Sequence, residues 1–511
     1  MMLLRGCCLL IFAGFLLPGA ESEAAPASTG AENGETKNSV TRPITLGEAL
    51  RLAHTQGRDK LVQNEELELL KLGLERTRGD YGPIFSSTLA SELYGTGSRQ
   101  NPGNRQNADL GVRQSLPGGG TVTANTGVNR TGPPGSDPAS SGTTTSVNVT
   151  QPILKGAGLA TWREPLTAAE RAFRYGLRAH RRYVQQLSLD IAKRYWSLQD
   201  RQFAVEQDRK ALIQAEWSVG LAKANLDLGK AQATALDVFR AETQLIQTSQ
   251  RLVDNQAAFA AELDGLKIDL ALPVDQPITI DADRPLATVV EVDATKVIAT
   301  ALAERSDLTT ARDNVDDADR RLATARRNLL PQLDATAGST WNGTFDGTSG
   351  DSYGQAPSWS TGLRLTIPLD RHNEDYGYES SLVSRRQVAL NAELKRSRVI
   401  QEVQAALQTL RSVEATLAIQ ERNRSQARVK VEKTLLDLQA GEVGNRDVVE
   451  SQNELTIAEN AWFQAQAAYR AAELALRNAA GVLIIQADGA WAETPPDYAT
   501  VKPKPQPKQA P

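Results

Sequence analysis

Apolar residues recur along much of the chain at intervals of three and four, which predicts long amphipathic helices. After Pro165 there is no proline up to residue 228, and there are only two glycines. At 1.5 Å per residue, such a run forms about 90–100 Å of helix. A second run, from about 378 to 440, carries Val399, Val403 and Leu410 at helical spacing. Stripes of this kind are typical of helices that pack side by side along their whole length.

Two other blocks, 84–153 and 332–368, alternate apolar and polar positions and predict strands. Val147 and Val149 alternate with polar residues in the first block, as Leu363 does in the second. This pattern suits a barrel strand between lipid and water, and equally a half-buried strand of a soluble sheet. The aromatic residues nearby would form interfacial girdles or would cap the sheet: Tyr81, Phe85, Tyr94, Trp341, Phe345, Tyr353, Trp359, Tyr376 and Tyr378.

The same order of elements occurs twice. Asp59 aligns with Asp307 and Pro83 with Pro331, because both offsets are 248 (307 − 59 and 331 − 83). Each unit opens with one helix, continues with strands and ends with a long helical run broken near a glycine. Repetition on this scale indicates a tandem duplication rather than a short solenoid. Repeat 1 spans 44–285, with an opening helix at about 45–80 and long helices over 160–270; repeat 2 spans 286–485, with an opening helix at about 293–329 and long helices over 378–483.

The two strand blocks differ in length. Pro83 and Pro152 are 69 positions apart, whereas Pro331 and Pro368 are 37 apart, a difference of 32. The extra sequence contains a predicted hairpin at 106–130 that turns at Pro117–Gly120. This hairpin either joins the sheet or extends outward as a surface loop, and the sequence leaves both open.

Both termini are predicted to lie outside the folded part. Arg5, the apolar run 7–17 and the small residues ending at Ala24 predict a signal peptide over 1–24. The run is shorter than the ~20 residues of a membrane helix. Lipidation would need Cys7 or Cys8, which lie before or within this run. Residues 25–43 are predicted to be a disordered leader, and the Pro/Lys-rich residues 486–511 a disordered tail.

Composition excludes several kinds of chemistry. With 57 basic and 61 acidic residues, the net charge of −4 gives no basis for binding nucleic acid. Both cysteines and both methionines lie in the predicted signal peptide, so the mature chain has no soft metal ligand or disulfide. There is no phosphate-binding glycine loop and no HExxH metal motif among the three histidines. We therefore predict no enzyme, no catalytic residue, no metal site and no cofactor. No later apolar run is long enough for a membrane helix, so a spanning structure would have to be a closed β-barrel.

Four segments carry a resemblance to a known family: TLGEALRLA at 45–53, RRNLLPQLDATAG at 326–338, LTIPLD at 365–370 and AGEVGNRDVVESQNEL at 440–455. In this order and in duplicate, they resemble the TolC-type outer-membrane efflux proteins over about residues 44–485. The resemblance implies an α+β membrane protein: a trimeric β-barrel, with four or more strands per protomer, continued by a long α-helical coiled-coil barrel.

The resemblance also implies a function. The chain would be the outer-membrane channel component of a tripartite efflux or type I secretion system in a Gram-negative bacterium. It would form a homotrimer in outer-membrane lipid, with its helices in the periplasm. A periplasmic adaptor and an inner-membrane pump would be its partners, since the chain has no nucleotide site of its own. The sequence does not indicate the transported substrate.

By the same resemblance, the helical turns form a gate. Asp447 and Glu450 match an acidic ring, Arg446 and Asp237 a latch, and Gly229, Gly441 and Gly444 the tip turns that contact the adaptor. The chain departs from the family pattern by lacking two residues between Arg446 and Asp447 and by having Glu as the second acid. Acids three apart share one helix face, and six carboxylates around a threefold axis would attract cations. Alternatively, these acids simply occupy a solvated helix N-terminus, where the helix dipole favours them.

A different class of function also fits the helices. A periplasmic or surface coiled-coil scaffold without a pore would need the same long apolar stripes. It would not account for the two alternating strand blocks.

Overall fold

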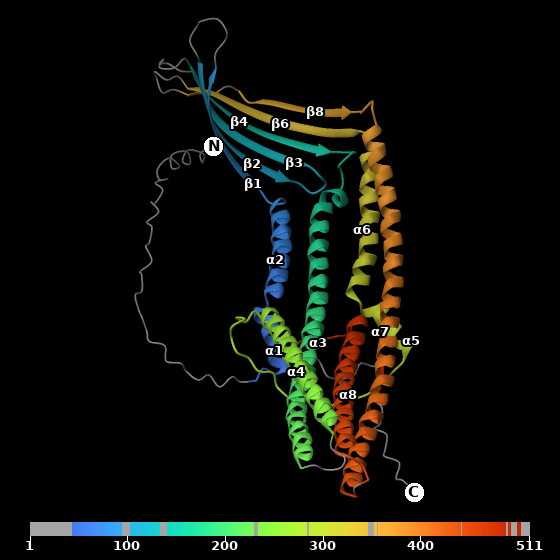
Figure 1. The fold of residues 1–511 in the computed structure, drawn as a ribbon. Helices are drawn as coiled ribbons and strands as arrows, with labels where there is room; N and C mark the ends of the chain where they lie inside the picture. The colour runs from blue at the N-terminus through green and yellow to red at the C-terminus, as the bar shows by residue number, and fades with distance from the viewer. Residues whose placement is uncertain are drawn as a thin grey trace, which may run out of the picture. The chain divides into compact units, whose positions relative to one another are not determined.

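The computed structural model describes residues 43–94, 103–132, 140–228, 234–283, 286–345, 352–354, 356–440, 442–486, 489–491 and 498–501. The predicted signal peptide and all but the last residue of the leader lie outside these ranges. The described chain consists of one large sheet and a set of long helices that extend from one side of it (Figure 1). The expected α+β class is thus confirmed.

The sheet has seven strands in the order β1-β2-β3-β4-β6, with β7 and β8 both paired to the far side of β6. All neighbouring strands are antiparallel. Every strand except the three-residue β7 has nine residues or more. The bounds are β1 Ile84–Tyr94, β2 Gly103–Ser115, β3 Thr121–Gly132, β4 Ser140–Pro152, β6 Gln332–Phe345, β7 Ser352–Gly354 and β8 Ser358–Thr366.

The structure decides the position of the extra hairpin. Strands β2 and β3 lie between β1 and β4: β2 pairs with β1, and β3 pairs with β4, along nearly their full length. They turn at residues 116–120, where Gly118 and Gly119 have positive φ angles of 96° and 95°. A residue with a Cβ is strained in this conformation, so the glycines allow the tight turn. The hairpin is therefore part of the sheet, not a surface loop.

The two repeats produce helices of matching length. The long helices α3 (Leu159–Asp227) and α7 (His372–Ala440) have 69 residues each. The returning helices α4 (Ala235–Asp269) and α8 (Asn445–Ala479) have 35 each. Next to the sheet the helices pack in the order α2-α3-α6-α7, and further away α4 and α8 replace α2 and α6 as neighbours of the long helices (Figure 1). Helix α2 spans Arg58–Gly79 and α6 spans Ser306–Asn328.

Each opening helix is broken, which the sequence pattern did not predict. Helix α1 (Leu46–Gln56) is separated from α2 at Gly57, and α5 (Ala294–Glu304) from α6 at Arg305. A Cβ at Gly57 would lie 3.3 Å from the backbone oxygen of Asp269, at the end of α4. At the equivalent place in repeat 2, Gly481, just after α8, adjoins Arg305. The breaks therefore let each returning helix meet the opening helix end to end.

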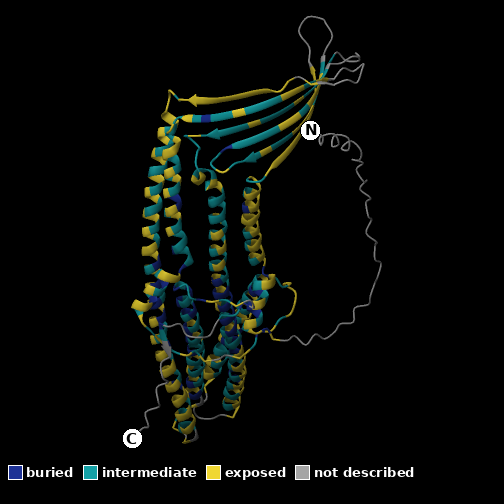
Figure 2. Ribbon diagram, turned by 180° about the vertical axis from the view of Figure 1, so that it is seen from behind, coloured by how far each residue is buried: buried dark blue, intermediate teal, exposed yellow. Residues whose placement is uncertain are grey.

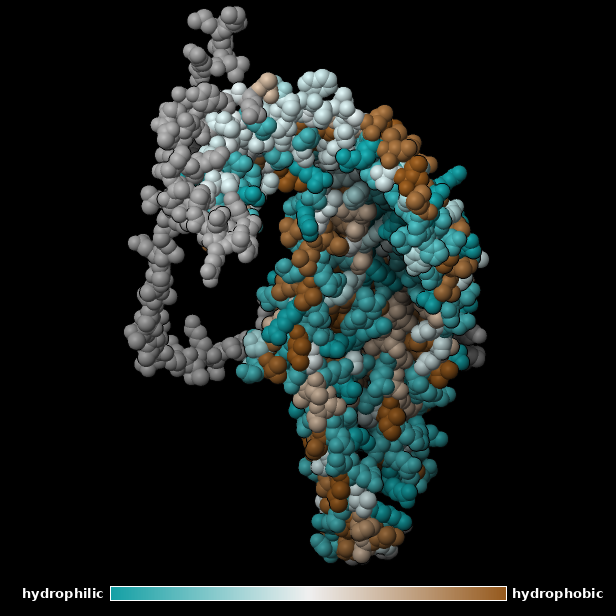
Figure 3. Space-filling model, turned by 90° about the horizontal axis from the view of Figure 1, so that it is seen from above, coloured by the Kyte–Doolittle hydropathy of each residue, from teal (hydrophilic) through white to brown (hydrophobic). Residues whose placement is uncertain are grey.

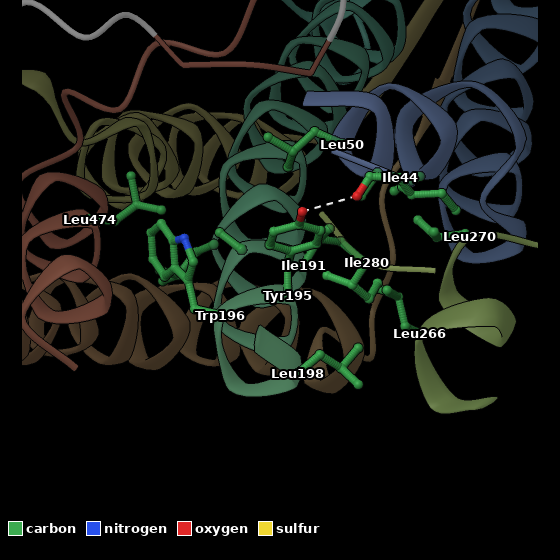
Figure 4. Packing of buried hydrophobic residues seen from close by; sticks show 14 of the residues in the cluster. Ile44, Leu50, Ile191, Tyr195, Trp196, Leu198, Leu266, Leu270, Ile280 and Leu474 are labelled. Atoms are coloured by element: carbon green, nitrogen blue, oxygen red, sulfur yellow. Dashed lines mark hydrogen bonds between the residues drawn. The ribbon is translucent and has the colours of Figure 1, made fainter. Parts of the chain in front are cut away.

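Buried side chains form two clusters among the helices far from the sheet (Figure 2), the first mainly from repeat 1, with Leu474 and Leu483 of repeat 2, and the second mainly from repeat 2. The first surrounds Tyr195, whose hydroxyl donates a 3.0 Å hydrogen bond to the backbone oxygen of Ile44 (Figure 4). The second includes Tyr469, whose hydroxyl accepts a 2.9 Å bond from the backbone N–H of Val290. Burial raises the pKa of Tyr469 to about 12, so this phenol stays neutral.

One part of the C-terminal tail is ordered, contrary to the prediction for 486–511. Strand β9 (Ala499–Val501) pairs with β5 (Val290–Val292), and Tyr498 is buried in the second cluster. Trp491 forms a β-bridge with Ile485 and packs edge-on against Trp196. The prediction of disorder rested on the Pro/Lys-rich composition of the segment. It did not consider Trp491 and Tyr498, whose aromatic rings pack against the folded chain.

No helix within the described ranges combines the length and the apolar composition needed to cross a bilayer.

Candidate functional site

The candidate site is the pair of helical turns farthest from the sheet. Helix α3 ends at Asp227 and α4 begins at Ala235, while α7 ends at Ala440 and α8 begins at Asn445. Two of the predicted tip glycines, Gly229 and Gly441, lie outside the described residues. Because α4 and α8 start 210 positions apart (445 − 235), Asp237 and Asp447 are equivalent residues of the two repeats.

Asp237 caps the start of α4. Its carboxylate accepts hydrogen bonds from the Thr234 hydroxyl at 2.7 Å and from the Thr234 backbone N–H at 3.1 Å. The Asp237 N–H in turn donates to the Thr234 hydroxyl at 3.3 Å. This reciprocal arrangement is a capping box, which satisfies backbone donors that the helix itself leaves unpaired. The T-x-x-D pattern of this box is readable from the sequence.

Positive charge gathers around Asp237. Hydrogen bonds from Thr234 lower the pKa of Asp237, and the charges of Arg240 and then Arg446 lower it further. Arg240 lies one helical turn on, with 3.7 Å between its guanidinium and the carboxylate. The structure therefore brings the two predicted latch residues, Asp237 and Arg446, within electrostatic range across the two repeats. Arg240 is a closer partner that the sequence analysis missed.

Asp447 caps α8 in a simpler way. Its carboxylate accepts a 3.0 Å hydrogen bond from the backbone N–H of Gly444, which has no side chain to complete the box. This finding gives direct support to the alternative in which Asp447 serves the helix N-terminus. A capping carboxylate remains charged and exposed, so capping and attraction of cations are compatible.

The two tips differ in charge at one equivalent position. Arg240 of repeat 1 corresponds to Glu450 of repeat 2 (240 + 210). In repeat 1 a cation neutralises the capping acid, whereas in repeat 2 a second acid follows it on the same face. Among the residues that the structure describes, neither Asp447 nor Glu450 forms an ion pair. Exposed carboxylates thus gather on the first turn of α8.

Packing holds the acids of α8 in place. On the same turn, Val448 and Ser451 are buried, and the Ser451 hydroxyl donates to the Val448 backbone oxygen at 2.9 Å. Further along, Arg428 on α7 reaches Glu459 on α8 at 2.8 Å. Asp447 and Glu450 therefore lie on the exposed face of a helix whose opposite face is fixed against α7. The arrangement can attract and order cations.

Comparison with known proteins finds similarity to efflux proteins of the outer membrane. Residues 297–482 match the family described as outer membrane efflux protein. The probable efflux pump outer membrane protein SepC from Pseudomonas putida is 27% identical over 188 residues, which are 36% of this chain and 37% of SepC. The aligned part thus spans little more than a third of that relative.

Solved structures share the fold over much more of the chain. The CmeC outer membrane channel of Campylobacter jejuni has a TM-score of 0.65 at 13% identity and covers 91% of this chain and 94% of its own. The outer membrane protein VceC of Vibrio cholerae has a TM-score of 0.63 at 15% identity, with 85% and 96% covered. Together, the sequence match in repeat 2 and the fold of the chain show that this protein is similar to outer membrane efflux proteins.

Proposed function

We propose that the protein is the outer-membrane channel of a tripartite efflux or type I secretion system, a passive exit duct across the outer membrane and periplasm of a Gram-negative bacterium. The observation that supports this best is the sheet, which has one apolar and one polar face. Its register aligns apolar residues of six strands on one face. These include Phe85, Leu89, Leu110, Val112, Val122, Ala124, Val147, Val149, Ala335, Ala337, Leu363 and Leu365.

Nothing in the described chain covers the apolar face. The exposed fractions of Phe85, Leu89 and Leu363 are 75%, 83% and 72%. No described helix packs along the sheet. A soluble protein would leave this apolar surface in water at a large free-energy cost, whereas a bilayer would cover it. The alternative of a half-buried soluble sheet therefore lacks the layer that would bury it.

The edges of the sheet and of the helix row argue for partner copies of the same chain. Strand β1 and helix α2 lie on one edge, and β8 and α7 on the other (Figure 1). An open strand edge and an unburied apolar helix face are both unfavourable in a membrane protein. Joining one edge to the opposite edge of the next copy is a head-to-tail contact that closes into a ring, here a homotrimer.

Exposed apolar side chains occur on both outer helices. On α2 they include Leu61, Val62 and Leu69, and on α7 Val383 and Leu390. Seen from above, hydrophobic residues occur in separate groups among hydrophilic ones along the helices (Figure 3). Such alternating surfaces suit side-by-side helix packing between copies.

At the helical tips the duct would be closed and opened. In this proposal Asp447 and Glu450 of three copies form an acidic ring, and Arg446 with Asp237 forms the latch. The tip turns, including Gly229, Gly441 and Gly444, would contact a periplasmic adaptor, and an inner-membrane pump would supply the energy. The effect of the Arg446 charge on the pKa of Asp237, and the lack of an ion pair at Asp447 and Glu450 among the described residues, support these assignments.

The proposal is tested with the purified full-length protein. We expect a detergent-resistant trimer from the outer-membrane fraction that conducts ions in planar lipid bilayers. Recovery as a monomer from the soluble periplasmic fraction would overturn the channel and favour a coiled-coil scaffold. That second function would explain the helices but leaves the two-faced sheet without a role.

A further inference from the structure

The added hairpin makes the two repeats contribute unequally to the sheet. In repeat 2, β6 and β8 pair directly with each other. In repeat 1, the equivalent strands β1 and β4 are separated by β2 and β3. One chain therefore supplies six long strands, which are the seven of the sheet without the three-residue β7.

The faces of the hairpin match those of the sheet around it. On one side Val112 lies opposite Phe85 of β1, and Ala124 lies opposite Val147 of β4. On the other side Arg113, Asp109 and other polar residues continue the polar face. A segment that merely attached to the edge of the wall, or folded outside it, would not need this two-sided agreement.

The hairpin also gives the sheet the width of the helix row beneath it. At a spacing of about 4.8 Å and a tilt of about 40°, each strand occupies about 6.3 Å of a barrel wall. Six strands then span about 38 Å, and four would span about 25 Å. The four helices α2, α3, α6 and α7, packed at about 8–10 Å, span about 32–40 Å. Only the six-strand sheet matches this width.

We propose that the sheet closes with the sheets of two further copies into a wall of eighteen strands (3 × 6), so that the outer mouth is as wide as the helical duct. This inference rests on the proposed trimeric channel and adds the size of its opening. The backbone-to-backbone diameter would be about 36 Å, compared with about 24 Å for twelve strands. The mouth then imposes no size limit of its own, and bulky or polymeric cargo is selected only at the helical tips.

The polar face is also built to keep the opening clear. Asparagine or aspartate side chains lie over glycines of the neighbouring strand, so that a Cβ on any of these glycines would collide with a side-chain oxygen. The pairs are Asn125 over Gly111, Asp109 over Gly127, Asn129 over Gly142 and Asn148 over Gly338. Three of the four pairs involve the hairpin. These side chains lie along the wall instead of projecting from it, which keeps the lining thin and polar.

The first test measures the ring directly. End-on electron-microscopy averages of the detergent-solubilised full-length protein should show a ring of about 36 Å at the sheet end. Deleting residues 103–132, which leaves β1 and β4 able to pair directly, should narrow this ring by about a third. A trimer whose full-length ring measures about 24 Å would overturn the wide mouth but keep the channel. Absence of any ring would overturn both.

The second test does not depend on the deletion variant folding. Leu110→Lys places a charge on the apolar face of the hairpin, and Asn107→Lys on the same strand places it on the polar face. If the hairpin is part of the lipid-facing wall, Leu110→Lys should strongly reduce the yield of outer-membrane trimer while the control matches wild type. Equal yields for the two variants would show that the hairpin lies outside the wall.

Discussion

At the scale of single residues, mutation can separate the capping of α8 by Asp447 from the attraction of cations that we propose for Asp447 and Glu450. Asp447→Ala with Glu450→Ala should lower the preference for cations over anions severalfold and weaken block by divalent cations, because the carboxylates that attract cations are gone. The measurement is the reversal potential of single channels in a salt gradient.

The amide variants distinguish charge from capping. Asp447→Asn keeps an acceptor for the Gly444 N–H, and Glu450→Gln keeps the size of the side chain. If charge sets selectivity, the amide pair should behave like the alanine pair. Wild-type selectivity in the amide pair, with loss only in the alanine pair, would mean that helix capping and not charge explains the effect. Unchanged selectivity in both pairs would place these residues outside the constriction.

A second prediction concerns the ends of α4 and α8. Ala271 has a φ angle of +55°, and its equivalent in repeat 2 (271 + 210) is Gly481, with +77°. Both follow the helix in a Schellman motif, in which Leu272 N–H donates to Lys267 O at 2.8 Å and Val482 N–H to Arg477 O at 3.2 Å. A Cβ is strained at such a position by about 1–2 kcal/mol.

We therefore expect Ala271→Gly to stabilise the protein by about 0.5–1 kcal/mol, since the relieved strain exceeds the entropy cost of glycine. Gly481→Ala should destabilise it by more than about 1 kcal/mol, because the new Cβ would also lie 3.0 Å from Cγ of Arg305. Thermal midpoints of the two detergent-solubilised variants provide the comparison. A lower midpoint for Ala271→Gly would contradict the assigned strain.

At the scale of elements, a half-buried polar contact joins α2 to α3. The Lys60 ammonium donates to Nε2 of His180 at 2.6 Å, and Asn64 lies 3.0 Å from the same nitrogen. Burial and the charge of Lys60 lower the pKa of His180, so the folded state keeps this ring neutral. On acidification the unfolded chain takes up the proton first, near its ordinary pKa of about 6.5. The neutral ring therefore contributes to the free energy of unfolding above that pH. This contribution is lost as the pH falls toward the pKa of His180 in the folded state.

We expect hydrogen exchange at the α2–α3 contact to speed up as pH falls from 7 to 5, after correction for the intrinsic exchange rate. His180→Gln keeps hydrogen-bonding capacity but cannot titrate, so it should remove this pH dependence. If the variant and wild type responded alike, His180 would not be the titrating group.

Elements differed in how far the sequence could predict them. Helix length, strand alternation and the duplication followed from periodicity, which reflects one buried face per element. The breaks at Gly57 and Arg305 did not, because they arise where the end of a returning helix meets the opening helix, a contact between distant segments. The tail was missed for the same reason: Tyr498 is buried next to β5, a segment that lies far away in the sequence.

The candidate site was predictable only in part. The acids and the latch pair came from family resemblance, and composition alone would not have selected them. The T-x-x-D capping box at Thr234 was readable from sequence. The role of Arg240 could not be predicted, because it depends on the alignment of the two repeats, which places Arg240 at the position of Glu450. In repeat 1 the charge of Arg240 offsets that of Asp237, whereas repeat 2 has a second acid at this position.

At the scale of the whole molecule, the proposal requires that β1 of one copy meets β8 of the next. The mature chain is predicted to contain no cysteine, so introduced pairs can report this contact without interference. Leu89→Cys on β1, combined with one cysteine at Trp359, Thr361, Leu363 or Leu365 on β8, scans the unknown register between copies. Mild oxidation should give covalent dimers and trimers on denaturing gels for at least one pair, since opposite Cβ atoms of paired strands lie about 4.5–5.5 Å apart.

The matched control combines Leu89→Cys with Ala124→Cys on β3, a strand inside the sheet. Ala124 shares the apolar face, but it lies on a strand with no free edge to offer a neighbour. This pair should remain monomeric on the gel. Equal cross-linking in the control would indicate random collision, and no cross-linking in any edge pair would refute the head-to-tail ring. The hairpin enlarges each copy without altering either edge, so the same β1–β8 contact should close the wall in the variant that lacks residues 103–132.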